Sequence, residues 1–302
     1  MIKIPPFLLP GDTIGLVCPA GYMQREKTLS CIRTLQLWGY RVEVGSTVGG
    51  DSGNYFSGTD SQRLADLQAM LDDPAIKAVL CARGGYGVGR IVDQIDFSAF
   101  RKRPKWIVGF SDITVLHAHV HARYRISTLH APMAGAFNGE GAQSPSVQSL
   151  KRALQGKKAS YSCPASPYNR TGKAQGELVG GNLSLLAHLT GTASDISTKG
   201  KILFMEDLGE YLYQADRMLY QLRRSGKLDN LAGLVVGGFT DMKDTDRPFG
   251  KTIQEIIMDL VGDYPYPVCF DFPISHGAEN VAVKTGVPHL LQVGRRKVTL
   301  QE

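Results

Sequence analysis

The first half of the chain alternates short apolar runs with amphipathic runs, and this alternation constrains the fold more than any other feature of the sequence. The apolar runs predict buried strands at residues 13–18, 41–44, 75–82 and 105–110. Helical spacing of apolar residues predicts helices at 26–38, from Thr59 or Asp60 to Asp73, at 88–94 and at 112–122. Strands that alternate with helices are typical of parallel sheets with crossover helices, so we expect an α/β fold.

A change of composition divides the 302 residues into two parts. Residues 157–176 are rich in Ser, Pro, Gly and Lys and poor in aliphatic residues, as segments between domains often are. We therefore expect an N-terminal domain over 1–160, a linker over 161–176 and a C-terminal domain over 177–302. In the C-terminal domain, apolar runs predict strands at 202–205, 231–239 and 268–272 and a strand or hairpin at 290–300.

Charge and cysteine usage narrow the partners and the compartment. The net charge of +6 favours anionic ligands, but the densest basic run, residues 101–105, lacks interleaved aromatic residues that stack on bases, so we expect no nucleic-acid partner. The five cysteines are odd in number and widely spaced, which favours free thiols in a reducing cytoplasm. No apolar run approaches the roughly 18 residues that cross a bilayer, and the N-terminus lacks a signal-peptide pattern. We expect a cytoplasmic protein without a membrane partner.

A serine follows the last predicted strand of the first half. The run 108–112, Val-Gly-Phe-Ser-Asp, places Ser111 at a turn between strand and helix, where a nucleophile elbow holds its serine. Gly109 leaves room for the turn, while Ile113 occupies the position of the second glycine in the usual G-x-S-x-G pattern. The same residues also fit an ordinary helix start, with Ser111 as the N-cap and Asp112 in the first turn. Both interpretations stay open on this motif alone.

A glycine-rich turn follows the predicted strand at 75–82. Residues 83–87 read Arg-Gly-Gly-Tyr-Gly, and such a loop can present backbone N–H groups to a phosphate or to the oxyanion of an acyl transfer. No Gly-Lys-Ser/Thr follows it, so it is not a P-loop, and its glycine spacing differs from the dinucleotide-binding fingerprint. A plain tight turn is the alternative interpretation.

An acid and a histidine lie at further strand ends. Glu206 closes the apolar run at 202–205, and His276 lies in the turn after 268–272. Taken singly, Glu206 also fits a helix-capping acid and His276 a surface histidine. Together with Ser111 they give the order serine, acid, histidine, with a glycine loop upstream for an oxyanion. This constellation predicts hydrolytic acyl transfer by an activated serine.

Three histidines at alternate positions suggest a metal site at first sight. His117, His119 and His121 lie on a predicted helix, where only His117 and His121 share a face, and no Cys or carboxylate lies at ligand spacing nearby. We therefore expect no metal and no cofactor. These histidines and His130 are predicted to be structural.

Five segments carry a resemblance that extends from the first predicted strand to the last. They are residues 82–87, residues 109–114, Gly180-Gly181-Asn182-Leu183, Glu206-Asp207 with 216–219 downstream, and His276 with Gly286 ten residues later. In order and spacing they resemble the serine LD-carboxypeptidases, also called muramoyltetrapeptide carboxypeptidases. The resemblance implies a flavodoxin-like parallel-sheet N-terminal domain, a smaller C-terminal α/β domain with a β-barrel-like sheet, and an active site between them.

The resemblance also implies a mechanism without a metal. Ser111 would attack the peptide carbonyl, His276 would take and return its proton, and Glu206 would orient the imidazole. The backbone N–H groups of Gly85 and Asp112 would form the oxyanion hole.

The substrate implied by the resemblance is a peptidoglycan-derived tetrapeptide, from which the terminal D-alanine is removed at an L-to-D bond. Arg83 or Arg217 would bind the free carboxylate of this substrate. A homodimer is expected for the family. This chain departs from the family pattern at Ile274-Ser275 before His276 and at Lys284-Thr285, so its histidine loop is predicted to differ in shape.

Two alternative functions stay open at this point. The first is a peptidase similar to the microcin-immunity enzymes of the same superfamily, which would cleave an aminoacyl-nucleotide toxin and would need an aromatic surface for the base. The second is a non-catalytic protein that binds anionic ligands through the glycine loop.

Overall fold

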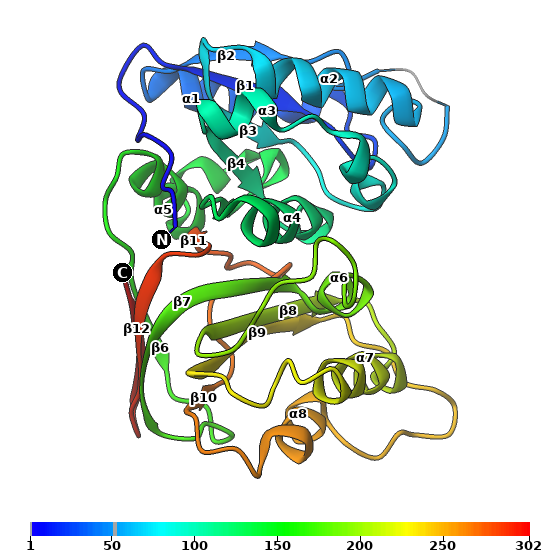
Figure 1. Ribbon diagram of the computed structural model, residues 1–302, viewed down its shortest axis with the longest axis vertical. Coiled ribbons are helices and arrows are strands. Elements are labelled where there is room, and N and C mark those ends of the chain that lie inside the picture. The colour runs from blue at the N-terminus through cyan, green and yellow to red at the C-terminus, as the bar shows by residue number, and fades with distance from the viewer. Residues whose placement is uncertain (1, 51–52) are drawn as a thin grey trace. The chain divides into compact units, whose positions relative to one another are not determined.

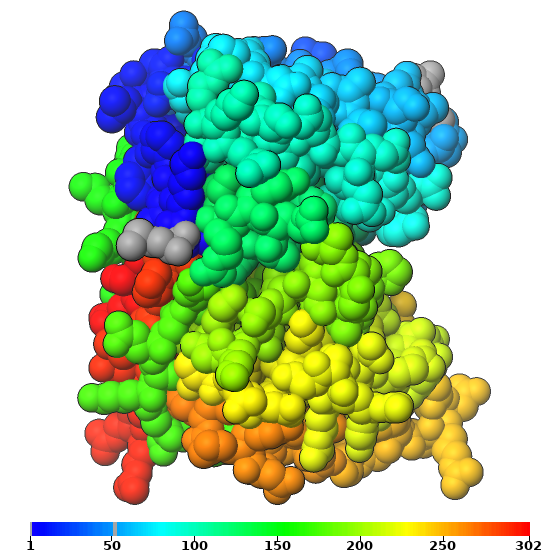
Figure 2. All heavy atoms as spheres, in the orientation of Figure 1, coloured from blue at the N-terminus to red at the C-terminus, as the bar shows by residue number. Residues whose placement is uncertain are grey.

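The computed structural model describes residues 2–50 and 53–302 and divides the chain into two compact units (Figure 1). Unit 1 comprises the residues up to Lys157 together with Val281–Lys284, and unit 2 comprises Lys158–Asn280 and Thr285–Glu302. The atoms of each unit can be followed by colour in the space-filling view, blue to green for most of unit 1 and green to red for most of unit 2 (Figure 2). Within the described ranges, no helix is long and apolar enough to cross a membrane.

Unit 1 is built on a six-stranded sheet in the order β11-β5-β4-β3-β1-β2, in which every neighbouring pair is parallel except β11 and β5. The strands are β1 (Thr13–Val17), β2 (Arg41–Val44), β3 (Ile76–Cys81), β4 (Trp106–Gly109), β5 (Leu129–His130) and β11 (Val283–Lys284). The helices are α1 (Leu29–Leu37), α2 (Asp60–Asp72), α3 (Ser98–Lys102), α4 (Thr114–Tyr124) and α5 (Pro145–Leu154). The predicted α/β fold with parallel strands is confirmed.

Helices pack on both faces of this sheet. On one face, Leu35 of α1 and Leu150 of α5 share a buried cluster with Leu16 of β1. On the other face, the neighbouring Gly15 lies against α2, since a Cβ at Gly15 would stand 2.6 Å from Met70 Sδ. Because successive side chains of a strand point to opposite faces, both faces of β1 are covered. Strands buried on both faces explain the continuous apolar runs in this half of the sequence.

Helix α2 begins at the position that the sequence predicts. Thr59 Oγ1 accepts a hydrogen bond from the Gln62 N–H (3.2 Å), and the Gln62 side chain accepts one from the Thr59 N–H (2.8 Å), which is a capping box. The segment 88–94 differs from its prediction, because it forms two 3₁₀ turns, Val88–Arg90 and Val92–Gln94, and no α-helix. Gly89, a poor helix former, lies within the first of these turns.

Unit 2 is built on a seven-stranded sheet in the order β10-β9-β8-β7-β12-β13-β6. Strands β7 to β10 run parallel, and β7, β12, β13 and β6 pair antiparallel. The strands are β6 (Ser160–Pro164), β7 (Gly172–Asn182), β8 (Ile202–Leu208), β9 (Gly233–Thr240), β10 (Val268–Cys269), β12 (Pro288–Val293) and β13 (Lys297–Gln301). The helices are α6 (Leu183–His188), α7 (Leu212–Arg224) and α8 (Ile253–Val261).

This second sheet curls until its ends approach one another. Arg170, which follows the edge strand β6, makes two backbone hydrogen bonds with Val268 of β10, at 2.9 and 3.1 Å. Next to it, Asn169 Oδ1 accepts a hydrogen bond from the Phe270 N–H at 2.8 Å. These contacts join the segment after β6 to the opposite edge of the sheet, as a β-barrel-like sheet requires.

The segment 161–176, expected to be a linker, is part of the unit 2 sheet. It contains most of β6 and the first residues of β7. β6 is an edge strand in which exposed and half-buried residues alternate, so its composition is as polar as that of a linker. Residues 281–284 return to unit 1, where β11 pairs with β5, and a strand of two residues leaves no pattern in the sequence.

All five cysteines are free thiols, and four of them are buried. Burial raises the pKa of the Cys18 thiol to about 12 and that of the half-buried Cys163 to about 11. Thiols with such pKa values are largely protonated at neutral pH and react slowly, in agreement with the predicted free cysteines.

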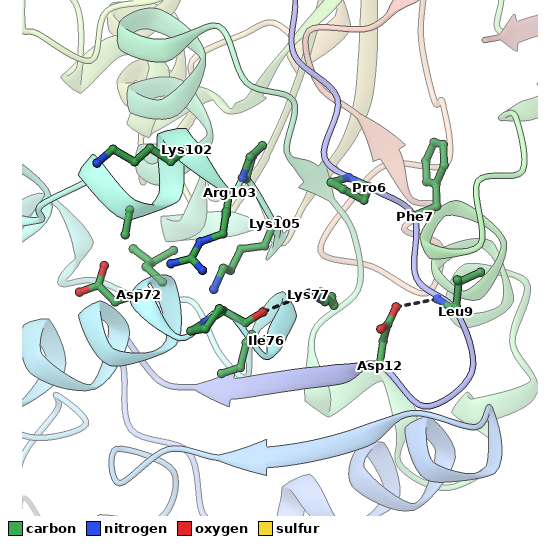
Figure 3. Close-up of a pocket in the computed structure, with 14 residues that line it drawn as sticks. Pro6, Phe7, Leu9, Asp12, Asp72, Ile76, Lys77, Lys102, Arg103 and Lys105 are labelled. Atoms are coloured by element: carbon green, nitrogen blue, oxygen red, sulfur yellow. Dashed lines mark hydrogen bonds between the residues drawn. The ribbon is translucent and has the colours of Figure 1, made fainter.

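A pocket of about 460 Å³ lies at the amino ends of β3 and β4 in unit 1 (Figure 3). Arg103 and Lys105 lie close together in it, above Ile76. Ser111 follows the carboxyl end of β4, so it lies at the opposite end of the strands from this pocket. Because open α/β sheets bind their ligands outside the carboxyl ends of the strands, this pocket is separate from the candidate active site.

Candidate active site

Ser111 lies at the turn that joins β4 to α4. β4 ends at Gly109, and a 3₁₀ turn, Ser111–Ile113, leads into the helix. Ser111 has a φ of +62°, which residues other than glycine, asparagine and aspartate rarely adopt. Strained backbone at a strand-to-helix turn is the geometry of a nucleophile elbow. An N-cap residue has extended backbone instead, so the conformation favours the nucleophile interpretation.

Gly109 explains how this turn accommodates Ile113, which departs from the usual elbow pattern. A Cβ at Gly109 would stand 2.9 Å from Ile113 Cγ1, closer than two carbons can approach. The single glycine before Ser111 therefore makes the space that the second glycine provides in G-x-S-x-G.

The glycine loop of residues 83–87 lies directly beside Ser111 within unit 1. A Cβ at Gly84 would stand 2.8 Å from Ser111 Cβ and 3.0 Å from Ser111 Oγ. The Gly84 carbonyl accepts a hydrogen bond from the Gly21 N–H at 2.9 Å. Because a trans peptide points its C=O and N–H in opposite directions, the N–H of Gly85 points away from Gly21. Within residues 2–50 and 53–302, the N–H groups of Gly85 and Asp112 have no hydrogen-bond acceptor.

Asp112 links the nucleophile turn to the glycine loop through its side chain. It is 1% exposed, and its Oδ2 accepts a hydrogen bond from the Val88 N–H at 2.8 Å. Burial raises the pKa of this carboxyl to about 6, and the hydrogen bond from Val88 opposes the shift. The side chain therefore has a structural role, while its backbone N–H lies at the Ser111 turn.

The buried Asp112 carboxyl predicts a pH dependence of stability. Its folded-state pKa lies above its unfolded value, so the folded protein binds more protons between about pH 4 and 6, and stability falls as the pH rises through this range. Asp112→Asn removes this penalty. The difference in free energy of unfolding between Asp112→Asn and the original protein should therefore increase by ~2–3 kcal/mol from pH 4 to pH 7, in favour of the variant. Urea unfolding of both proteins at the two pH values measures this change. Asp263→Asn, which removes an exposed carboxyl, is the control and should show no such rise; an equal difference at both pH values would contradict the assignment.

Glu206 lies near the carboxyl end of β8 and is completely buried. The register of β8 against β9 shifts between Met205 and Asp207, and such an irregularity can redirect a side chain. Glu206 Oε2 lies 2.5 Å from His276 Nδ1. Facing a carboxylate oxygen, Nδ1 carries the proton and donates, which leaves Nε2 as the basic nitrogen of the neutral ring. Two of the three predicted catalytic side chains, Glu206 and His276, are thus in contact within unit 2.

Asp207 fixes the strand end from which Glu206 projects. Its Oδ1 accepts from Asn182 Nδ2 at 2.8 Å, and its Oδ2 accepts from the Ser184 N–H at 2.9 Å. Asn182 in turn caps α6. The preceding Gly180 lets β7 approach β8, because a Cβ there would stand 1.8 Å from the Phe204 carbonyl oxygen. The Gly-Gly-Asn motif therefore supports Glu206 through the backbone of two adjacent strands.

The turn that carries His276 is closed by the residue before it. Ser275 Oγ donates to the Glu279 carbonyl at 2.8 Å and accepts from the Gly277 N–H at 3.0 Å. The turn also packs on β9, where the Gly238 N–H donates to the Ile274 carbonyl at 2.9 Å. Ile274-Ser275 thus supplies a local means of holding the turn that carries His276.

The two arginines considered for carboxylate binding lie in different units. Arg83 belongs to the glycine loop of unit 1, is exposed, and donates from Nη1 to the Tyr22 carbonyl at 2.7 Å. Arg217 is exposed on α7 of unit 2, where its guanidinium lies 5.5 Å from the centroid of the Tyr213 ring.

The three histidines of α4 have separate partners. His117 Nε2 lies 2.8 Å from the Gly109 carbonyl, His119 stacks on Phe97 at 5.3 Å, and His121 Nε2 lies 3.0 Å from Arg125 Nη1. His130 lies 5.8 Å, ring to ring, from Phe110. Among the described residues, no three His, Cys, Asp or Glu side chains form a group that could hold a metal ion.

Two aromatic residues, Tyr86 within the glycine loop and Tyr55 beside it, were not singled out from the sequence. Tyr55 and Tyr86 are 56% and 52% exposed, and a Cβ at Gly85 would stand 2.9 Å from the Tyr55 hydroxyl oxygen. Both rings contact Phe56, with centroids 5.5 and 5.9 Å away. The signal available in the sequence was the position of Tyr86 inside the glycine loop.

Comparison with known proteins places both halves of the chain in one family. Residues 14–131 match the LD-carboxypeptidase N-terminal domain, and residues 175–291 match the LD-carboxypeptidase C-terminal domain. A probable murein peptide carboxypeptidase of Bacillus subtilis is 38% identical, over 98% of this chain and 94% of the relative. The murein tetrapeptide carboxypeptidase of Pseudomonas aeruginosa is 30% identical, over 93% of this chain and 94% of the relative.

Solved structures agree with these matches. The muramoyltetrapeptide carboxypeptidase of Oxalobacter formigenes superposes with a TM-score of 0.86 at 28% identity, over 96% of this chain and 98% of that chain. The microcin C7 self-immunity protein MccF in complex with aspartyl sulfamoyl adenosine also gives 0.86, at 21% identity over 100% and 98% of the two chains, which is a likeness of fold. The resemblance inferred from the five sequence segments is confirmed: the chain belongs to the LD-carboxypeptidase family.

Proposed function

We propose that this protein is a serine carboxypeptidase that removes the terminal D-alanine from murein tetrapeptides and leaves the tripeptide, with Ser111, His276 and Glu206 as its catalytic triad. The proposal follows the names of the relatives with 30% identity or more over most of their length. The observation that carries it is the pair of His276 Nδ1 and Glu206 Oε2, because a buried carboxylate on Nδ1 prepares an imidazole to act as a base through Nε2.

The reaction proceeds in two steps in this proposal. Ser111 Oγ attacks the carbonyl carbon of the L,D peptide bond while His276 Nε2 takes its proton. His276 then returns the proton to the amine of the leaving D-alanine, and an acyl ester remains on Ser111. A water molecule, deprotonated by His276, hydrolyses this ester and restores the serine. Glu206 keeps the proton on Nδ1 and stabilises the imidazolium that forms in each step.

The oxyanion of each step is assigned to the backbone N–H groups of Gly85 and Asp112. Support comes from the closeness of Gly84 to Ser111 and from the lack of other acceptors for these two groups in the described structure. Preformed donors of this kind stabilise developing charge without reorganisation during the reaction. Of the two arginines, Arg83 is favoured for the substrate carboxylate because it belongs to the same loop as Gly85.

The substrate assignment predicts stereospecific release of D-alanine. Incubation with the disaccharide tetrapeptide should release D-alanine and the tripeptide, measured by mass spectrometry, while the same peptide ending in L-alanine should stay intact. Millimolar EDTA should leave the rate unchanged, because neither nucleophile nor oxyanion donors depend on a metal ion in this mechanism. A chelator-sensitive reaction would contradict the mechanism, and an intact D-alanine substrate would contradict the substrate.

One observation favours a second candidate function. The exposed rings of Tyr86, in the glycine loop, and Tyr55, beside it, offer the aromatic surface that a nucleotide base needs, and MccF of Escherichia coli is 22% identical over 98% of this chain. Cleavage of an aminoacyl sulfamoyl adenosine, with no action on murein peptides, would establish this function instead. The homodimer and the cytoplasmic location stay predictions.

A further inference from the structure

Arg63 is completely buried in unit 1, although arginine is among the residues least often buried. It lies in the first turn of α2, with its guanidinium 4.8 Å from the centroid of the Phe56 ring. Nη2 pairs with Asp60 at the start of the same helix. Taking an ion pair out of water is costly, and apolar replacements of similar volume are often as stable. Stability alone therefore does not explain this arginine.

The remaining contacts of Arg63 join two loops at the carboxyl edge of the sheet. Nη1 donates to the Pro19 carbonyl, in the loop after β1, at 2.7 Å, and to the Gly87 carbonyl, in the glycine loop, at 3.0 Å. Gly87 has a φ of +146°, and a Cβ there would stand 2.6 Å from Nη1, so a glycine is required for this contact. Arg63 thus fixes the end of the glycine loop to the loop after β1.

Two further contacts hold the same loop, and both lead to the candidate site. The Val88 N–H donates to Asp112, directly after Ser111, at 2.8 Å. At the other end, the Gly84 carbonyl accepts from the Gly21 N–H at 2.9 Å. Gly21 lies two residues after Pro19. The Gly21 N–H and the Arg63 guanidinium therefore attach the two ends of the glycine loop to the same loop after β1. Gly85 lies between these anchors.

We propose that Arg63 is a positioning residue for the oxyanion hole: it fixes residues 84–88 so that the Gly85 N–H stays beside Ser111. This inference rests on the proposed function, in which Gly85 is an oxyanion donor. Such donors act only within ~2.7–3.1 Å of the oxyanion, and a misplacement of about 1 Å can cost ~10² in rate. The buried guanidinium therefore acts on the reaction through the loop and does not touch the substrate.

The chain offers a matched control for Arg63. Arg90 pairs with the same Asp60 at 2.7 Å, and its guanidinium lies 5.5 Å from the same Phe56 ring. It is exposed, and in the described part of the chain its guanidinium reaches the glycine loop only through the Tyr86 side chain. The Arg90 backbone N–H also donates to the Gly87 carbonyl at 3.2 Å, and this bond is kept when the side chain is replaced. Replacing each arginine with methionine therefore separates the loop contact from the ion pair.

The test compares Arg63→Met and Arg90→Met in the release of D-alanine from the murein tetrapeptide. For Arg63→Met we expect kcat to fall about 10²-fold with KM changed less than about threefold, because the lost interaction acts in the transition state. For Arg90→Met both constants should stay within about twofold. Arg63→Lys keeps a cation but has a single nitrogen, which cannot take the place of both Nη2 on Asp60 and Nη1 on the two carbonyls, so its kcat should fall about tenfold. Arg63→Lys also replaces Arg63→Met if that variant does not fold.

Thermal unfolding, followed by circular dichroism, separates a positioning role from a purely structural one. The proposal is overturned if folded Arg63→Met or Arg63→Lys keeps a kcat within about threefold of the original. It is also overturned if the loss of kcat disappears on cooling to a temperature at which the variant is fully folded.

Labelling of Ser111 with a fluorophosphonate distinguishes a failure of this proposal from a failure of the proposed substrate. The labelling rate depends on the same oxyanion donors but not on a murein peptide, so it should fall in Arg63→Met and not in Arg90→Met. Equal rates in Arg63→Met and the original protein would refute the positioning role. No release of D-alanine by the original protein, together with slower labelling of Arg63→Met, would refute the substrate alone.

Discussion

Ser111→Ala is expected to lower kcat for D-alanine release by at least ~10⁴-fold, because the substitution removes the atom that forms the acyl-enzyme. Binding of the tetrapeptide should persist with a Kd within about threefold of the original value, since the hydroxyl contributes mainly to the transition state. Steady-state assays and isothermal titration calorimetry measure the two quantities. Retained turnover would refute the assignment of the nucleophile.

The control for this variant is Ser111→Gly. The φ of +62° at position 111 strains any residue with a Cβ, and glycine adopts it without strain. Ser111→Gly should therefore be as inactive as Ser111→Ala and at least as stable towards urea. If the original protein bound the tetrapeptide without cleaving it, the non-catalytic alternative would be supported instead.

The parts of the fold that the sequence predicted are those with strong local patterns. The strands β1 and β4 are buried along their whole length, as is β3 except at the exposed Lys77, and α2 carries its own capping box at Thr59. β6 and the start of β7 were missed, because an edge strand with alternating exposure is as polar as a linker. β11 was missed because its pairing with β5 depends on chain segments about 150 residues apart, and no local pattern records such a contact.

In the candidate site, too, the residues next to strong local patterns could be predicted from the sequence, and a residue held by distant contacts could not. Ser111, Glu206 and His276 were predicted because each follows a strand, and the structure pairs Glu206 with His276. Arg63 gave no signal, because a charged residue in an amphipathic helix is ordinarily assigned to the solvent face. Its burial depends on carbonyl groups of Pro19 and Gly87, 44 and 24 residues away in the chain. Interactions of this kind become visible only when the fold has brought the loops together.

Glu206→Gln is expected to lower kcat about 10³-fold with little change in KM, because the carboxylate acts on His276 and not on the substrate. Glu206 is completely buried, and His276 Nδ1 is bonded to its Oε2. If the glutamine oxygen faces Nδ1, the ring keeps its tautomer but loses the negative charge that stabilises the imidazolium. If the amide nitrogen faces Nδ1, the tautomer reverses and Nε2 no longer accepts the serine proton. Both orientations slow proton transfer.

Glu279→Gln is the matched control for this prediction, because it removes an exposed carboxylate from the same turn as His276. Its backbone carbonyl, which accepts from Ser275 Oγ, is unaffected by the substitution. We expect kcat of Glu279→Gln to stay within about twofold of the original value. Equal losses in both variants would mean that the net charge of the turn, and not the bond from Nδ1 to Glu206, sets the rate. A loss confined to Glu206→Gln would assign the effect to that bond, since the two substitutions change the charge equally and differ in whether the carboxylate contacts the imidazole.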